Sequence, residues 1–337
     1  MLWLPVSAGE KMKPLVSVIV EAYNEEANAL APPEETFQAL LKQDFPLEQT
    51  ELIVLGSAQQ IAHWKVAYAE LPRFQRVQML SAPPEHSHYW QLKNKGVELA
   101  EGDIVALLDC DAPPMPQWLS SGVRALREGA DASVGPSQYR TSRLKPDSPW
   151  MLAAALPSWS FSLHMSSTRQ QLRAASLLAH NLIVRRSLLL QYPFRLFRRS
   201  FPSSLLFFEL QRSGVKFSYQ PQQRVAHPMN FRWWLARAHF RRGWETYAGR
   251  EADPGWPRLR LLRRLRWIEP VVLRMGLVCC DASHWFRFSR MLGVGRAKAI
   301  VLFPIALVAS LLARTSEMIG MYAALLAPKA SEHQARF

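Results

Sequence analysis

Two aspartates separated by one residue, Asp109 and Asp111, follow an apolar run at residues 104–108. The run is short, continuous and begins with β-branched residues, which predicts a buried strand that Pro113 and Pro114 prevent from continuing. Carboxylates at the C-terminal end of such a strand lie at the sheet edge where α/β proteins bind ligands. Two carboxylates this close repel each other unless a cation lies between them. The pattern predicts a Mg²⁺ or Mn²⁺ site for a diphosphate, with an Asp-rich turn as the alternative.

Strand and helix patterns alternate before this pair of aspartates. Apolar runs predict strands at residues 15–20 and 52–55, a third short strand is predicted at residues 76–80, and helical patterns occupy residues 61–71 and 89–100. Such alternation predicts a largely parallel α/β sheet that is covered by helices.

The predicted helix at residues 89–100 has one apolar face. Lys93, Asn94 and Lys95 lie mostly off this face. The face itself is formed by Tyr89, Leu92, Gly96, Val97 and Ala100.

The composition narrows the class of protein. The 337 residues suffice for one large domain, or for one domain and an appendage. The formal net charge of +14 suits either a nucleic acid or an anionic membrane surface. The basic residues gather late in the chain among aromatic and apolar residues, without a helix-turn-helix, zinc-finger or RNA-recognition signature, so we expect a membrane partner and no nucleic acid. The three cysteines form no CxxC pair, which fits a reducing compartment.

Three segments resemble one family. Residues 16–26, Val-Ser-Val-Ile-Val-Glu-Ala-Tyr-Asn-Glu-Glu, resemble the opening strand of glycosyltransferase family 2, the nucleotide-sugar-dependent enzymes of GT-A fold. Residues 92–111 resemble the family's Asn-x-Gly, Ala-x-Gly-Asp and Asp-x-Asp block in order and spacing, and residues 179–186 are similar to its acceptor-side strand. The resemblance covers about residues 14–245. It implies a GT-A fold, which is a Rossmann-like α/β sheet.

The resemblance also implies an activity and a set of site residues. The reaction is an inverting transfer of a sugar from a nucleotide-sugar to an acceptor hydroxyl. Asp109, Asp111 and His227 hold Mn²⁺ or Mg²⁺ on the diphosphate, although a lone His before Pro228 also suits a structural loop. The residues that line the nucleotide-sugar pocket are Glu21, Tyr23, Asn24, Glu25, Lys93, Asn94 and Asp109.

Two departures from the family's pattern concern acidic residues. Residues 55–58, Leu-Gly-Ser-Ala, follow the second strand, where family members usually carry acids that bind the nucleobase. Pro202 and Ser203 stand where the family carries the acid pair that supplies the general base. Glu209 is the nearest carboxylate, and it is either that base or the solvent-facing residue of a helix. A catalytically silent family member that acts as a membrane-bound partner is the alternative to an active transferase.

The end of the chain combines arginine, aromatic residues and apolar runs. Residues 232–266 contain ten Arg and no Lys, which predicts an amphipathic helix on an anionic leaflet or a packed helix with a basic face. Within them, residues 239–243 resemble a basic segment of related enzymes that lies over the diphosphate. Residues 299–313 form an apolar helix of only ~22 Å. Reaching the ~30 Å of a hydrocarbon core takes Arg314 and Glu317 into the helix, where they can pair at i,i+3.

These patterns predict three regions. We expect a GT-A-like domain at residues 14–230, a basic interfacial segment at 231–266 and hydrophobic membrane-associated helices at 267–328. The helices can span the membrane, form a hairpin or lie in its plane, and a soluble core helix is the remaining alternative. Residues 1–13 hold too short an apolar stretch for a secretory signal, and arginines lie beside the apolar runs. We therefore expect the catalytic domain on the cytoplasmic side of the cell inner membrane, with a lipid-linked or envelope glycan as acceptor.

Overall fold

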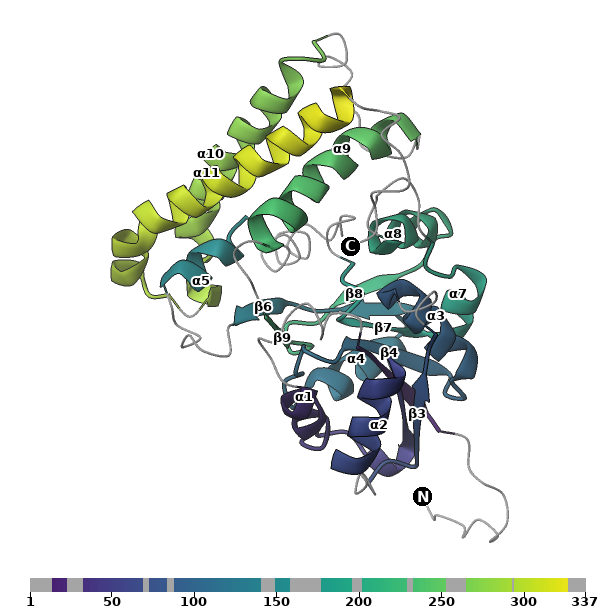
Figure 1. The fold of residues 1–337 in the computed structure, drawn as a ribbon. Coiled ribbons are helices and arrows are strands. Elements are labelled where there is room, and N and C mark those ends of the chain that lie inside the picture. The colour runs from purple at the N-terminus through teal and green to yellow at the C-terminus, as the bar shows by residue number, and fades with distance from the viewer. Residues whose placement is uncertain are drawn as a thin grey trace, which may run out of the picture.

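A mixed seven-stranded sheet forms the centre of the part of the chain that this computed structural model describes (Figure 1). The described residues are 14–22, 33–68, 73–83, 88–140, 149–157, 177–195, 202–228, 233–252, 265–292 and 294–326. The strands lie in the order β3-β2-β1-β4-β7-β5-β8. Their bounds are Val16–Glu21 (β1), Thr50–Gly56 (β2), Arg76–Ser81 (β3), Ile104–Asp109 (β4), Ala132–Val134 (β5), Leu182–Arg185 (β7) and Phe217–Tyr219 (β8).

The direction of pairing changes in the middle of this sheet. Parallel pairing joins β3, β2, β1 and β4, whereas β7 is antiparallel to both β4 and β5. β8 is parallel to β5, and two further strands, β6 (Ser137–Arg140) and β9 (Val225–Pro228), form a small parallel sheet. The four strands predicted in the first third of the chain are all present.

Helices cover both faces of the large sheet. Phe37, Trp64 and Trp118 pack on one face and Leu92 and Phe207 on the other, and alternate residues of β1, β2 and β4 contribute to each cluster. Because these strands are buried on both faces, their sequences are mostly apolar without a polar alternation, and the buried Ser17 and Glu51 satisfy each other with a hydrogen bond of 2.7 Å. The helices are α1 (Pro33–Leu40), α2 (Ala58–Ala67), α3 (Tyr89–Leu99), α4 (Trp118–Arg127), α7 (Arg186–Gln191) and α8 (Pro202–Arg212), with a short 3₁₀ helix at Leu47–Gln49.

The second helix, α2, begins earlier than predicted. Its pattern predicted a start at Ile61, but the helix starts at Ala58 because Ser57 caps it. Ser57 Oγ accepts a hydrogen bond from Gln60 N at 3.3 Å, and Gln60 Oε1 accepts one from Ser57 N at 2.8 Å. This capping box satisfies two amides that the first helical turn leaves free.

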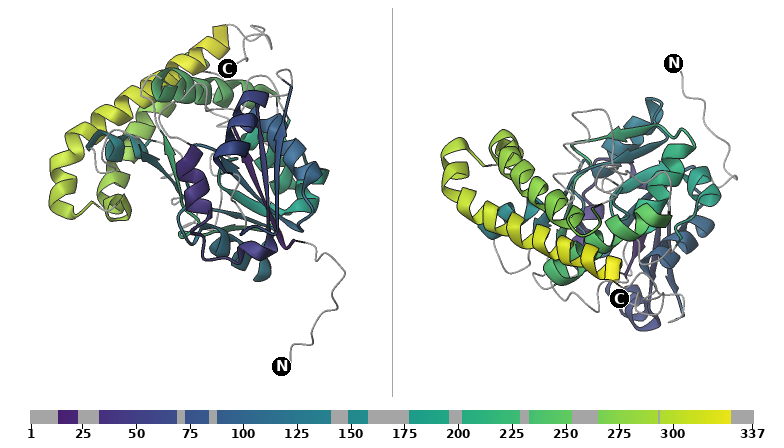
Figure 2. Two further views of the ribbon diagram at one scale, coloured as in Figure 1. Left: turned by 60° about the horizontal axis from the view of Figure 1, so that its bottom comes forward. Right: turned by 90° about the horizontal axis from the view of Figure 1, so that it is seen from above.

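The helices of the C-terminal third, together with the short helix α5 from the middle of the chain, form a layer beside the sheet (Figures 1 and 2). Figure 1 shows α11 between α9 and α10. Met151, Trp234, Trp285 and Ala306 belong to the apolar cluster of this layer. Its elements are α5 (Pro149–Ala155), a π-helix η4 (Trp233–His239), α9 (Phe240–Ala252), α10 (Glu269–Phe288), a 3₁₀ helix η6 (Ser289–Leu292) and α11 (Arg296–Leu326).

The described part of the predicted interfacial segment is packed in protein. Trp234, Trp244 and Tyr247 are buried, in contrast to aromatic residues that face a membrane interface. This packing favours the packed-helix alternative for residues 233–252, whereas residues 253–264 lie outside the described part of the chain.

Candidate active site

Three charged side chains meet where β1 and β4 end. The register aligns Glu21 of β1 with Asp109 of β4. Lys93 of α3 lies between them, with Nζ 3.1 Å from Glu21 Oε1 and 2.5 Å from Asp109 Oδ1. Burial alone lowers the pKa of Lys93, but the charges of Asp109 and Glu21 outweigh burial and raise it. The helical pattern that placed Lys93 off the buried face was wrong, because two strand-end carboxylates neutralise the ammonium in the core.

The other oxygen of Asp109 faces two histidines. Asp109 Oδ2 lies 3.9 Å from His180 Nδ1 and 3.8 Å from His227 Nε2. These three ligand atoms lie within 4.8 Å of one another, and the three residues are buried. Burial lowers the pKa of His180 to about 3, so its imidazole is neutral at pH 7. Ser137 Oγ lies 3.0 Å from His180 Nε2, and a proton on Nε2 leaves the Nδ1 lone pair available to a metal ion.

Asp111 lies beside this cluster as a buried carboxylate. Among the described residues, neither of its oxygens has a hydrogen-bond partner. Burial raises the pKa of Asp111 to about 6, with the charge of His227 opposing the shift and that of Asp109 reinforcing it. A buried carboxylate without a partner, next to a second carboxylate and two imidazoles, is a donor set for a divalent cation. The residues present therefore fit Mn²⁺ or Mg²⁺.

The topology explains why one member of the cluster escaped sequence analysis. Asp109, Asp111 and His227 were predicted as ligands and lie near one another, and their role as ligands stays a prediction. His180 was missed, since the sequence indicated only that residues 179–186 resemble a strand. Because β7 is antiparallel to β4, the residue that precedes β7 reaches the C-terminal end of β4.

The predicted nucleotide-binding residues are placed less completely. Asn94 binds a neighbouring loop, where its Nδ2 donates to Phe194 O at 2.8 Å and its Oδ1 accepts from Phe194 N at 2.9 Å. Tyr23, Asn24 and Glu25 lie outside the described residues. The nucleotide-binding role of these residues stays a prediction.

The predicted base, Glu209, lies half-buried on α8. Phe207 and Leu210 on the same helix are buried in the core. The backbone oxygen of Glu209 accepts hydrogen bonds from Ser213 N at 3.1 Å and Ser213 Oγ at 2.9 Å near the end of the helix. Within the described part of the chain, no hydrogen bond or ion pair joins its carboxylate to the Asp109 cluster, so the role as base stays a prediction.

Two charged residues of α9 act on Tyr89, which lies beside Lys93. The Tyr89 ring centroid lies 5.9 Å from Lys93 Nζ. Burial raises the pKa of Tyr89, while the charge of Arg241 lowers it and the charges of Asp109 and Glu245 raise it. Arg241 and Glu245 of α9 are therefore within electrostatic range of Tyr89, whose ring lies beside Lys93. The sequence singled out the basic segment around Arg241 but gave no signal for Glu245.

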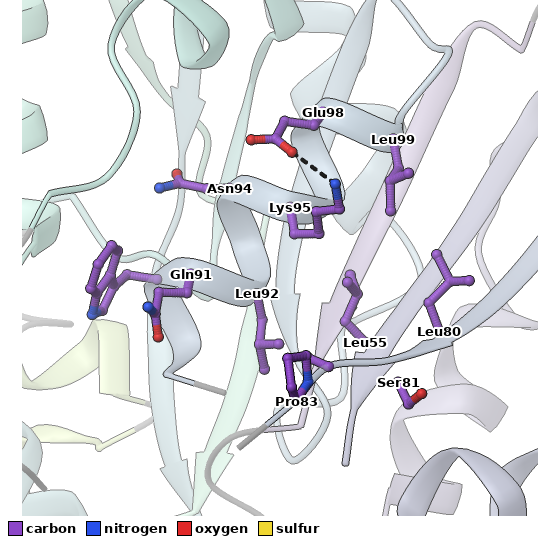
Figure 3. A pocket seen from close by; sticks show the side chains of 12 residues that line it. Leu55, Leu80, Ser81, Pro83, Gln91, Leu92, Asn94, Lys95, Glu98 and Leu99 are labelled. Atoms are coloured by element: carbon purple, nitrogen blue, oxygen red, sulfur yellow. Dashed lines mark hydrogen bonds and ion pairs between the residues drawn. The ribbon is translucent and has the colours of Figure 1, made fainter. Parts of the chain in front are cut away.

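A separate cavity of about 620 Å³ lies along α3, next to the ends of β2 and β3 (Figure 3). Figure 3 shows Leu55, Leu80 and Leu99 converging, with the Lys95–Glu98 ion pair of 3.0 Å to one side. None of the aspartates and histidines described above lines this cavity. Its aliphatic wall includes Leu55, at the strand end where the family's nucleobase-binding acids are absent.

Comparison with known proteins assigns the family. The sequence profile described as "Glycosyl transferase family 2" matches residues 17–192. The chain belongs to glycosyltransferase family 2. The glycosyltransferase AglE of Haloferax volcanii is 29% identical over 113 residues, which are 34% of this chain and 36% of AglE. The hyaluronan synthase of Pasteurella multocida is 44% identical over 48 residues, which are 14% of this chain and 5% of the synthase. The chain thus matches about a third of AglE and a small part of the synthase.

A solved structure confirms the predicted fold of this family 2 glycosyltransferase. The mannosyltransferase PcManGT from Pyrobaculum calidifontis, in complex with GDP-Man and Mn²⁺, aligns with a TM-score of 0.55 at 19% identity. The alignment covers 94% of this chain and 88% of that chain. The GT-A fold expected from the sequence is therefore present, with a long apolar helix near the C-terminal end.

Proposed function

We propose that this family 2 glycosyltransferase moves a sugar from a nucleotide-sugar donor to an acceptor hydroxyl, with inversion and with a divalent cation. The observation that supports this most is Asp111, a buried carboxylate whose oxygens lack a described partner, beside Asp109, His180 and His227. The cluster lies at the carboxyl ends of the parallel strands, where α/β sheets bind ligands. The similar fold of PcManGT, which was solved with GDP-Man and Mn²⁺, supports the same donor class and cofactor.

The chain's own residues have distinct roles in this proposal. Asp109, Asp111, His180 and His227 would hold Mn²⁺ or Mg²⁺, and the bound ion would stabilise the charge that develops on the leaving diphosphate. Two imidazoles among the ligands favour Mn²⁺ over Mg²⁺, which prefers oxygen ligands. Lys93 binds Asp109 Oδ1 and so leaves Oδ2 to face the histidines.

The donor's remaining parts are recognised by residues around this cluster. We assign the nucleotide to Glu21, Tyr23, Asn24 and Glu25, which end or follow β1, together with Asn94. Arg241 places a positive charge within electrostatic range of Tyr89, whose ring lies beside Lys93, and this charge suits the diphosphate.

Donor binding tests the proposal directly. Nucleotide-sugars, beginning with GDP-Man, are screened by their effect on thermal unfolding with Mn²⁺, with Mg²⁺ and with EDTA. A donor at 100 times its Kd adds ~2.7 kcal/mol to the free energy of unfolding. We expect such a shift with Mn²⁺, a smaller one with Mg²⁺ and none with EDTA. Absence of any shift, together with absence of metal-dependent donor hydrolysis, contradicts the proposal and indicates the catalytically silent partner.

The base is assigned by a pair of substitutions. An inverting transfer needs a proton acceptor near the acceptor hydroxyl, and an amide cannot take that proton. We expect Glu209→Gln to lower kcat by at least ~100-fold and to leave the donor-induced melting shift unchanged. Glu245→Gln is the matched comparison, because Glu245 is a buried carboxylate close to Tyr89. If Glu209→Gln keeps its turnover and Glu245→Gln loses it, the base is Glu245 and Glu209 is a helix surface residue.

The acceptor and its location are part of the proposal. α11 is the one helix in the described part of the chain that is long and apolar enough to cross a membrane. We assign a lipid-linked or envelope glycan as acceptor and the cytoplasmic face of the cell inner membrane as the location. The arginines that flank the apolar helices support this orientation.

A further inference from the structure

The last two long helices expose apolar side chains along most of their length and bury several charged ones. From Ile300 to Leu326, the exposed positions of α11 are all apolar apart from Thr315, whereas Arg314 and Glu317 are buried. In α10, Arg274 and Asp281 are likewise buried, whereas Arg287 in its last turn is exposed. The large exposed apolar residues of α10 and α11 are Val271, Val272, Phe286, Ile300, Val301, Val308, Leu311, Leu312, Ile319 and Leu326. A helix that faces water shows the opposite arrangement.

The buried charges neutralise one another inside the helix layer. Arg314 Nε lies 2.9 Å from an Asp281 oxygen, and its NH1 lies 2.9 Å from Glu317 Oε1. Arg274 NH1 lies 2.8 Å from Glu317 Oε2, and His239 Nδ1 lies 2.8 Å from Glu317 Oε1. The pair that the sequence predicted, Arg314 with Glu317, is confirmed as part of this larger cluster. Charged residues of protein segments in lipid are paired and face the protein interior in this way.

The inner face of α11 is in close contact with the catalytic part of the chain. A Cβ at Gly243 of α9 would lie 1.8 Å from Glu317 O, and one at Gly320 would lie 2.0 Å from Phe240 O, so α9 and α11 touch backbone to backbone. Because α9 touches α11 backbone to backbone and carries Arg241, Arg242 and Glu245, α11 cannot cross a bilayer without drawing these charged residues toward the hydrocarbon. Figure 2 shows the α10–α11 pair at the edge of the molecule, away from the large sheet. The side of the pair that carries its exposed apolar residues, called here the outer face, is the part available to lipid.

Groups suited to a membrane interface lie at the two ends of this pair of helices. Exposed Trp267 lies against Tyr322, with ring centroids 6.4 Å apart. Where α10 turns into α11, four exposed basic residues gather. Trp and Tyr prefer the interface, and basic side chains there attract anionic head groups. The basic residues are Arg287, Arg290, Arg296 and Lys298.

We propose that the outer face of α10–α11 lies in the plane of an anionic phospholipid bilayer and buries its apolar side chains there without spanning it. This inference refines the membrane setting of the proposed function. The lipid is identified by its chemistry, since a broad apolar face with basic and aromatic groups at its ends fits an anionic interface.

Vesicle flotation of the purified full chain tests whether this outer face binds lipid. We expect binding to vesicles of phosphatidylcholine with phosphatidylglycerol, and weaker binding to phosphatidylcholine alone. The double variant V301D/V308D should bind the anionic vesicles at least ~10-fold more weakly, because charged groups at a lipid face are unfavourable. Val66→Asp is the matched control, since Val66 is 82% exposed but lies on α2, and its binding should equal that of the parent. The donor-induced melting shift should be the same in all three proteins, so failure of lipid binding is distinguished from failure of the proposed transfer.

Labelling on sealed vesicles tests the in-plane orientation. Arg296→Cys, at the start of α11, and Ser331→Cys, five residues after its end, mark the two ends of the helix in a chain whose exposed Cys279 and Cys280 are changed to Ser. An impermeant maleimide should label both ends to the same extent. Protection of one end until detergent is added overturns the in-plane arrangement. The proposal is also overturned if the parent chain does not bind vesicles and instead forms dimers that the V301D/V308D substitutions disrupt. That result would show that a second copy of the chain covers the outer face.

Discussion

Lys93→Met is expected to lower the free energy of unfolding by about 3–5 kcal/mol, because the change removes one partner from a buried ion cluster. Lys93 Nζ lies 3.1 Å from Glu21 Oε1 and 2.5 Å from Asp109 Oδ1, and the Lys93 and Glu21 side chains are fully buried. Methionine fills a similar volume but leaves two buried carboxylates without their counter-charge. Denaturant unfolding with EDTA present measures the loss.

Lys95→Met is the matched control for this substitution. Lys95 is two residues along the same helix and pairs with Glu98 at 3.0 Å, but both side chains are more than half exposed. An exposed pair at i,i+3 contributes ~0.2–0.5 kcal/mol, so this variant should unfold almost like the parent.

A second substitution shows whether charge is the cause. Glu21→Gln added to Lys93→Met removes one of the two uncompensated carboxylates, and we expect it to restore part of the lost stability. Equal unfolding of the Lys93→Met and Lys95→Met variants contradicts the buried cluster. A double variant less stable than Lys93→Met shows that packing, and not charge, is the cause.

The sequence predicted those parts of the fold that depend on local apolar pattern. Strands β1, β2 and β4 follow apolar runs and are recognisable because both of their faces are buried, whereas β3 mixes polar and apolar residues. Lys93 escaped the same reasoning, because a helical pattern treats lysine as solvent-facing and cannot know which strand ends will neutralise it. Its partners, Glu21 and Asp109, come from two strands that only the register of the sheet brings together.

Of the two histidines that lie near Asp109, the sequence predicted only one, for a related reason. His227 was found through its resemblance to a family position, whereas His180 has no local signal. Its approach to Asp109 depends on the antiparallel insertion of β7 between β4 and β5, which breaks the parallel order that the alternating pattern predicted. In the tail, spacing along one helix predicted the Arg314–Glu317 pair, but Arg274 and His239 reach Glu317 only through packing between helices.

Asp111→Asn is expected to lower transfer by at least ~100-fold, the effect of losing a principal electrostatic contact to the transition state. Asp111 is fully buried, and its two oxygens have no hydrogen-bond partner among the described residues. A bound cation is therefore the group that would stabilise the negative charge of this carboxylate. The amide keeps the shape of the side chain but removes the negative charge that a divalent ion requires.

The same substitution separates metal binding from folding. Burial raises the pKa of Asp111 to about 6, so at pH 7 the metal-free protein holds an ionised carboxylate at a cost that a neutral amide avoids. Without metal, Asp111→Asn should therefore melt no lower than the parent at pH 7. With Mn²⁺, the parent should gain stability and the variant should not.

Asp103→Asn is the control for this substitution, because exposed Asp103 lies just before the opposite end of β4. This control variant should keep both its turnover and its response to Mn²⁺. Full turnover by folded Asp111→Asn, with an unchanged Mn²⁺ response, would show that the cation is held elsewhere and that the metal assignment at this sheet edge is wrong.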